Sequence, residues 1–449
     1  MRILLLCLAI ALAAPQVLAA EPAPEAGSDQ PAAAAEPAPA KEAAAEPAAK
    51  PASDPPATAA ADSPKADAPK PAAANADSGK TEGEAAKADA KPKAKAVPFD
   101  PEPIDDQARF LAGLPVPEGS PLYGLQQTKF WKAYAKKFDA DWDKLHKERL
   151  DAMGDWAAKV LAPKIDPKAP VYYLFGGPDF LSVPVLYPEA PLYILGGLEP
   201  VGRMPPSLRA MGAAALEEDM RNLRSSLNSI IRLSFFKTND MREDLVRTEL
   251  RGVVPLLLVL AARADAKVLE YTRAEITDTG ELKDLGATEK CVGVPGARLK
   301  IQRNGSSATQ EVLYFKHDVS DPVIKAGPGF LAFFKKHAPA NTFLKAASFL
   351  LHRPKQFGLT RDFLVENSKS ILQDDSGLSF DLLAKGPFEL ILYGKYLRPR
   401  PPFTNRIQPD MTEAFNKGPV EPLPFLTGYR KTGESNLVLA ISKSKAPAP

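Results

Sequence analysis

The chain has 449 residues, of which 45% are hydrophobic and 25% are charged, and its formal net charge is +2. Nucleic-acid-binding domains concentrate basic residues on one face, so this nearly neutral balance argues against a nucleic-acid partner. Of the two cysteines, Cys7 falls in the N-terminal apolar run, which leaves Cys291 alone and predicts no internal disulfide.

Residues 1–19 predict a secretory signal peptide. Arg2 gives a positively charged start, residues 3–14 are apolar, and residues 17–19 (VLA) match a cleavage site. Cleavage is expected after residue 19, with Ala20 as the close alternative. No later segment is long and apolar enough to span a membrane, so the protein is expected in the periplasm or secreted. The alternative is an inner-membrane anchor made by the uncleaved signal, although its apolar run is shorter than the roughly 20 residues of a spanning helix.

Residues 20–97 predict a disordered tail. They consist almost entirely of Ala, Pro, Lys, Glu, Asp, Ser and Gly, and they contain no Leu, Ile, Met or aromatic residue. Such a segment cannot bury enough apolar surface to offset the entropy of ordering. If the signal stays uncleaved, the tail would be a tether. If the signal is cleaved, the tail would be a free solvating segment.

Residues 98–449 predict a single folded region that starts with a helical segment over 124–162. Large apolar side chains recur there at spacings of three and four, which is typical of a helix with one buried face. Further helices are predicted over 206–236, 252–265, 327–337 and 360–371, with a short crossover helix in 180–187. Strands are predicted over 171–175, 192–195, 268–276, 297–302, 311–316, 341–351 and 388–393.

The alternation of these elements predicts an α/β fold, with a mainly parallel sheet covered by helices. It is compatible with a Rossmann-like or methyltransferase-like topology that carries an enlarged insertion between residues 200 and 300.

Several motifs of well-known chemistry are missing. The four histidines are scattered, and the sequence has no HExxH, HxH or CxxC, so no metal site is expected. The nucleophile elbow G-x-S-x-G is absent. The stretch Gly428–Ser435 has P-loop glycine spacing, but Glu434 stands where the phosphate-binding lysine is needed. No strict G-x-G-x-x-G occurs, and no cofactor is expected.

Two glycine pairs follow predicted strands. Gly176 and Gly177 precede Asp179, and Gly197 precedes Glu199, about 20 residues further on. Dinucleotide folds place a glycine turn and a ribose-binding acid in this relation. The plainer interpretation is that both are tight strand ends whose acids cap turns. Nucleotide cofactors are scarce outside the cytoplasm, which favours a scaffold with altered or no cofactor use.

Two further polar clusters are candidates for acid–base chemistry. His317 and Asp318 close a predicted strand, and Asp374 and Asp375 close a predicted helix. Because strand-end residues of a parallel sheet gather at one edge, His317 with Asp318 or Asp374 could form an acid–base pair. The alternatives are a structural histidine and an ordinary polar turn.

The pieces GGPDFL, YPEA, GLEPVG, KAASFLLHRP and ILQDDSG, in this order within residues 170–400, resemble a family of uncharacterised exported bacterial proteins. The resemblance implies that Asp179, Glu199, His352, Asp374 and Asp375 belong to one recurring design. It implies no activity.

The sequence therefore predicts an exported envelope protein that binds a small molecule or an envelope component in a cleft at the strand ends. The residues expected to bind are Gly176, Gly177, Asp179, Gly197, Glu199 and His352. The alternative is a periplasmic hydrolase or transferase that uses an Asp/Glu/His cluster, with candidates Asp179, Glu199, His317, Asp318, Asp374 and Asp375.

Overall fold

The computed structural model describes residues 101–205, 207–233, 249–346, 349–399, 403–428 and 433–445. The predicted signal peptide and tail lie outside these residues. In the part that is described, no helix is both long and apolar enough to cross a membrane.

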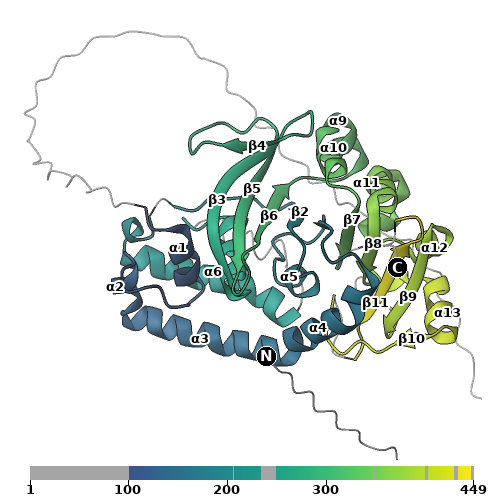
Figure 1. Ribbon diagram of the computed structural model, residues 1–449, viewed down its shortest axis with the longest axis horizontal. Helices are drawn as coiled ribbons and strands as arrows, with labels where there is room; N and C mark the ends of the chain where they lie inside the picture. Colours follow the sequence, from purple (N-terminus) through teal and green to yellow (C-terminus); the bar gives the residue numbers. More distant parts are fainter. Residues whose placement is uncertain are drawn as a thin grey trace, which may run out of the picture. The chain divides into compact units, whose positions relative to one another are not determined.

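Eleven described strands form one sheet, seen in Figure 1. Their order across the sheet is β10 (Val420–Glu421), β9 (Phe388–Gly394), β11 (Asn436–Ser442), β8 (Ser368–Gln373), β7 (Ala340–Leu344), β1 (Val171–Tyr173), β2 (Leu192–Gly197), β6 (Thr309–Lys316), β5 (Val294–Arg303), β3 (Ala266–Ile276) and β4 (Leu282–Leu285).

The sheet is mixed, so the expectation that it is mainly parallel is not confirmed. Strands β8, β7, β1, β2 and β6 form a parallel centre. On one flank β5, β3 and β4 pair antiparallel, and on the other β11 runs antiparallel between β8 and β9. The antiparallel flank β3–β5 lies inside the predicted insertion, where consecutive strands are joined by short turns instead of crossover helices.

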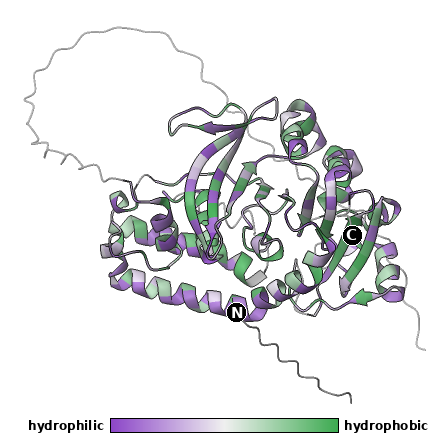
Figure 2. Ribbon diagram, in the orientation of Figure 1, coloured by the Kyte–Doolittle hydropathy of each residue, from purple (hydrophilic) through white to green (hydrophobic). Residues whose placement is uncertain are grey.

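Helices cover both faces of the sheet, and each face has its own hydrophobic core. Val171 and Tyr173 of β1 belong to one core while Tyr172 belongs to the other, because successive side chains of a strand point to opposite faces. Figure 2 shows mixed colouring along the helices and along β3, β4 and β5, and mostly hydrophobic colouring along β9 and β11.

The first core is covered by α1 (Ile104–Leu111), α3 (Lys129–Leu145), α4 (Asp151–Trp156), α5 (Val183–Leu186), α6 (Ala213–Leu233) and α8 (Val253–Arg263). The second is covered by α9 (Asp321–Ala326), α10 (Gly329–Lys336), α11 (Pro354–Asn367), α12 (Phe380–Lys385) and α13 (Pro409–Lys417). The described residues also form the short helices α2 (Tyr123–Gln126), η4 (Arg209–Met211), η5 (Leu350–His352) and η6 (Thr404–Arg406).

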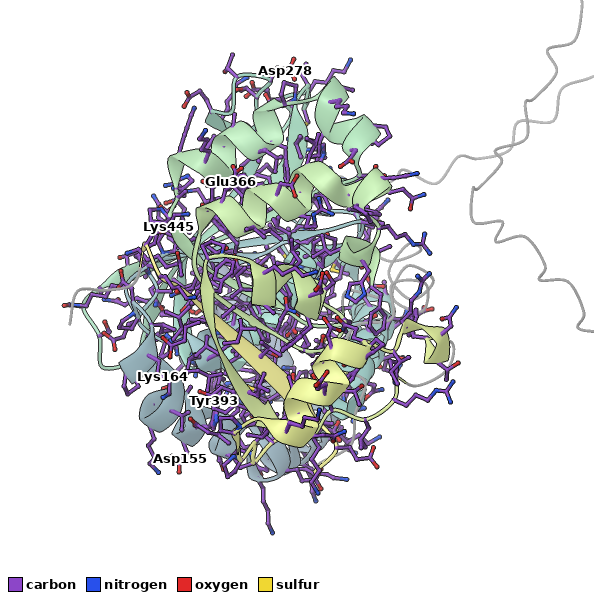
Figure 3. The ribbon with its side chains drawn as sticks, turned by 90° about the vertical axis from the view of Figure 1, so that its right-hand side faces the viewer. Asp155, Lys164, Asp278, Glu366, Tyr393 and Lys445 are labelled. Atoms are coloured by element: carbon purple, nitrogen blue, oxygen red, sulfur yellow. The ribbon has the colours of Figure 1, made fainter. Side chains whose placement is uncertain are left out.

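The predicted helical segment 124–162 is present and contains two irregular turns. From Lys129 the chain stays helical to Lys164, but π turns interrupt it at η1 (His146–Leu150) and η2 (Ala157–Leu161), before a final 3₁₀ turn, η3 (Ala162–Lys164). Figure 3 shows Asp155 and Lys164 of this run on the same side of the molecule as Tyr393 of β9, and the Trp156 and Tyr393 rings meet at 5.0 Å.

Several predicted boundaries differ from the structure, and two of these differences bear on the candidate site. The predicted strand 341–351 ends at Leu344, because Ala346 and Phe349 take positive φ values of 54° and 59° that an extended strand cannot contain. The predicted helix 360–371 ends at Asn367, and the chain continues as β8. Asp374 and Asp375 therefore close a strand, because tertiary pairing with β7 and β11 decides the conformation of residues 368–373.

A buried carboxylate holds the first described residues against the fold. The Glu102 side chain has no exposed surface; its Oε1 accepts from Ser207 Oγ at 2.7 Å and Arg209 Nε at 3.0 Å, and its Oε2 accepts from the Leu208 amide at 2.9 Å. Burial alone would raise the pKa of this carboxyl, but these hydrogen bonds outweigh burial and leave the pKa lowered.

We expect Glu102→Gln to lower the free energy of unfolding at pH 7 by about 1–3 kcal/mol, since charge-assisted hydrogen bonds are lost in a buried place. The lowered carboxyl pKa means that this contribution is present near neutrality and is lost on acidification, so the effect of the substitution should shrink as the pH falls. Urea titration at two pH values measures it. Glu118→Gln, at an exposed position, is the control, and an equal loss in both variants would contradict the interpretation.

Candidate functional site

The parallel centre brings the carboxyl ends of β1, β2, β6, β7 and β8 to one edge of the sheet. From β1 the chain proceeds to β2 and β6 on one side, and it later runs from β7 to β8 on the other side. The position between β1 and β7 is therefore a topological switch point, the place where open α/β sheets bind their ligands.

Asp179 lies beside this switch point, in the loop after β1, and is 1% exposed. Its Oδ1 accepts from the backbone N–H groups of Leu181 at 3.2 Å and Ser182 at 3.3 Å, which orders the turn into α5. Its Oδ2 accepts from the Tyr173 hydroxyl at 2.9 Å and from Lys345 Nζ at 2.6 Å. Both oxygens of Asp179 thus accept hydrogen bonds within the protein, and they order the loop after β1.

Lys345 is the cation of this pair and directly follows β7. Its side chain is 1% exposed, and its Nζ also donates to Ser182 Oγ at 2.9 Å. Burial lowers the pKa of the ammonium, and the nearby Asp179 carboxylate opposes that effect. The ion pair connects the loop after β1 to the end of β7, across the switch point.

Gly176 makes room for the tyrosine that binds Asp179. A Cβ at Gly176 would collide with the ring of Tyr173, whose hydroxyl donates to the aspartate. A glycine is therefore needed here for the close approach of the Tyr173 side chain.

Gly177, Gly197 and Glu199 lie together at the ends of β1 and β2. Gly177 has φ +56°, and a Cβ there would lie 3.0 Å from Glu199 Oε2. A Cβ at Gly197 would collide with that carboxylate and would lie 2.8 Å from Gly177 Cα. Glu199 is 4% exposed, and the Tyr314 hydroxyl donates to its backbone oxygen at 2.9 Å and to Oε2 at 3.3 Å. The glycine turns after β1 and β2 thus meet beneath one carboxylate.

The carboxylates after β8 lie on the other side of Lys345. Asp374 Oδ1 accepts from the Ser376 amide at 3.0 Å and hydroxyl at 2.6 Å, and its Oδ2 accepts from the Ala346 amide at 3.0 Å. Burial, followed by the charge of Asp375, raises the pKa of Asp374 to about 6. Asp375 accepts from Asn436 Nδ2 of β11 at 3.3 Å.

No contact in the described part of the chain joins His317 to Asp374 as an acid–base pair. The His317 ring stacks on Phe330 with centroids 4.3 Å apart, and its Nε2 has no partner there. Burial lowers its pKa. Asp318 accepts from the Ser320 amide at 2.9 Å, as expected for a carboxylate that orders a turn.

His352 lies in η5, after the end of β7, with its ring 5.1 Å from that of Phe349. Burial lowers its pKa to about 4, although an interaction with the Gly377 backbone favours the charged form. The interaction places His352 near the turn that follows Asp374 and Asp375.

Two buried cations of this region escaped the sequence analysis. Lys345 stands in a stretch predicted as strand, and Arg149 stands among charged residues of the first helical segment. Both are buried, and the negative charge of Asp179 acts to raise the pKa of each. A lysine or arginine in such surroundings gives no sequence signal of burial.

Within the described residues, no group of three or more His, Cys, Asp or Glu side chains could hold a metal ion. No protein-family model, curated protein or solved structure matches the chain.

We expect Lys345→Met and Asp179→Asn each to cost about 3–5 kcal/mol of unfolding free energy, because each leaves the other charge buried without its partner. The double variant should cost less than the sum of the two, since it leaves no unpaired charge. Urea unfolding of the four proteins measures the coupling.

The exposed pair Lys385 and Asp381 is a matched control, and its coupling should stay below about 1 kcal/mol. Additive losses for Asp179 and Lys345 would show that the two charges do not depend on one another.

The lowered pKa of His352 predicts a loss of stability in acid. The unfolded histidine takes up a proton near its ordinary pKa of 6.5, whereas the folded one resists protonation down to about 4. Between pH 7.5 and pH 5 the wild type should therefore lose about 2 kcal/mol that His352→Gln does not lose. Urea unfolding at both pH values tests this, and parallel pH curves for the two proteins would contradict it.

Proposed function

We propose that the chain is an exported binding protein with a doubly wound, methyltransferase-like core, and that it binds a small ligand carrying a vicinal diol at the ends of β1 and β2. In this proposal the carboxylate of Glu199 accepts hydrogen bonds from two neighbouring hydroxyl groups. The glycine turns at Gly177 and Gly197 leave room for the Glu199 carboxylate, which is the group that would meet the ligand.

The strand order supports the proposal. When β1, β2, β6, β7, β8, β9 and β11 are numbered one to seven along the chain, their order in the sheet is 3-2-1-4-5-7-6. The first five follow the order of the doubly wound dinucleotide-binding fold. The seventh is antiparallel and inserted before the sixth, which corresponds to the methyltransferase-like variant.

The observation that carries the proposal is the position of Glu199. Its carboxylate lies against Gly177 of the first glycine turn, at the carboxyl end of the neighbouring strand. Doubly wound folds place the acid that recognises ribose hydroxyls at this point. Nucleosides and sugars share the vicinal diol, and both are consistent with this chemistry.

A periplasmic hydrolase or transferase is the second candidate, and Asp374 favours it. A carboxyl whose pKa is raised to about 6 can hold or release a proton near neutrality, as acid–base catalysis requires. Its three hydrogen bonds are made to neighbouring protein groups, which equally suits a structural role. The binding function is therefore preferred.

Export is supported by residues 1–19, with their charged start, apolar run and cleavage pattern. The proposed location is the periplasm or the cell exterior, and an inner-membrane anchor is the alternative if the signal remains.

Native mass spectrometry of protein exported with its own signal is the test. We expect a mature mass that starts near Ala20, and binding of adenosine or methyl riboside. Glu199→Gln should weaken this binding about 10- to 100-fold, since hydrogen bonds to a charged acceptor are lost. Removing the 2′-hydroxyl, as in 2′-deoxyadenosine, should have a similar effect on the wild type.

Glu189→Gln, at an exposed position before β2, is the control and should bind like the wild type. Binding of adenosine but not methyl riboside would indicate a nucleoside, and binding of both would indicate recognition of the sugar alone. A clean apo mass without binding of either compound, or equal binding by Glu199→Gln, would contradict the proposed diol site.

A further inference from the structure

A π turn in the first helical run directs an arginine into the protein interior. Arg149 lies in η1, between α3 and α4, and is 3% exposed. The extra residue of a π turn shifts the helix faces relative to each other, and such turns are frequent at functional sites. A long charged side chain is thereby buried in a segment whose neighbours Lys147 and Glu148 are exposed.

Part of the guanidinium caps another helix. Arg149 Nη2 donates to the carbonyl oxygens of Ile230 at 2.9 Å and Ile231 at 3.0 Å, in the last turn of α6. These are carbonyls at the negative end of the helix dipole, where a cation is stabilising. Nη1 has no hydrogen-bond partner in the described parts of the chain.

The capping role leaves the positive charge without an ion pair. Asp179 attracts Arg149 electrostatically, but its two oxygens accept from Lys345 and from groups of its own loop and strand. No salt bridge to Arg149 is present in the described structure. A buried charge without a bonded counterion is costly, which calls for an anion nearby.

A pocket of about 490 Å³ borders this arginine, between α3, η1 and α6. This volume is within the range of small-molecule sites. Arg149 lines it together with apolar side chains and one exposed amide: Leu145, Ile231, Leu426 and Asn228. The charged side chains of Asp141, Lys144 and Glu148 line it as well, so Arg149 lies beside both apolar and charged groups.

The other charges along the pocket are paired. Asp141 binds Arg224, and Glu148 lies 3.8 Å from Lys144. Arg224 lies outside the lining, so the lining charges sum to zero, and Arg149 is the lining cation that has no salt bridge in the described structure. One positive charge matches a carboxylate better than a phosphate dianion, and the apolar wall suits a hydrocarbon body.

We propose that this pocket is a second binding site, distinct from the strand-end site, for a small carboxylic acid with an apolar body. Its carboxylate pairs with the guanidinium of Arg149, and its hydrocarbon part lies along Leu145, Ile231 and Leu426.

Octanoate and octanol are matched probes, because they share the chain length and differ in charge. Isothermal titration of the full mature protein should show octanoate binding at least about tenfold tighter than octanol. Arg149→Gln should remove this preference. Since that variant replaces a buried helix cap, Asn228→Trp provides a second test that leaves Arg149 in place and fills the pocket from an exposed position.

We expect Asn228→Trp to weaken octanoate binding at least about tenfold, with the melting temperature of the free protein unchanged. Glu199→Gln should bind octanoate like the wild type, which separates this site from the proposed diol site. The proposal is overturned if octanoate does not bind, if octanol binds equally well, or if Asn228→Trp binds octanoate with wild-type affinity.

Discussion

The buried ion pair between Asp179 and Lys345 is the interaction on which the arrangement of the strand ends depends. Asp179 accepts hydrogen bonds from the Tyr173 hydroxyl of β1, from two backbone amides at the start of α5, and from the Lys345 ammonium at the end of β7. The chain leaves the switch point in two directions, from β1 to β2 and β6 on one side and from β7 to β8 on the other. The Asp179 carboxylate connects the segment after β1 to the end of β7. A buried charge of this kind is stable only while its hydrogen-bond and ion-pair partners stay in place.

The same constraint explains why the neighbouring acids differ in their environments. Asp374 lies beside the Ala346 amide, next to Lys345, but the lysine is already bonded to Asp179 at 2.6 Å. Asp374 is therefore stabilised by neutral donors, and burial with Asp375 nearby raises its pKa. Glu199 lies instead over the glycine turns, with the Tyr314 hydroxyl as a donor. The strand ends thus carry a buried ion pair, with a carboxyl of raised pKa, Asp374, on one side and the glycine-lined carboxylate of Glu199 on the other.

Much of this edge could be predicted from the sequence, and the missing parts have physical causes. The strands before Gly176 and Gly197 are short apolar runs that end in glycines, so their ends and Glu199 were accessible to pattern analysis. Lys345 and Arg149 were not, because burial of a cation depends on partners distant in sequence. Residues 368–373 combine polar and apolar residues without a clear period, and only pairing with β7 and β11 makes them a strand. Strand β11 was missed for a similar reason, since an isolated apolar run after a long proline-rich segment has no local partner.

The two buried cations also show how the helical layer and the sheet are connected. Asp179 exerts the largest electrostatic attraction on both Arg149 and Lys345. Among the described contacts, its direct hydrogen bond is the one to Lys345. Lys345 follows a strand of the sheet, whereas Arg149 lies in a π turn of a helical run that packs on the sheet. The guanidinium of Arg149 caps α6. Because the cations repel each other and share the attraction of one carboxylate, a change of charge at either one alters the stability of the other. The π turn therefore places Arg149 where the charge of Asp179 acts on it. Through these two side chains, the outer helical layer is electrostatically coupled to the strand ends at the switch point.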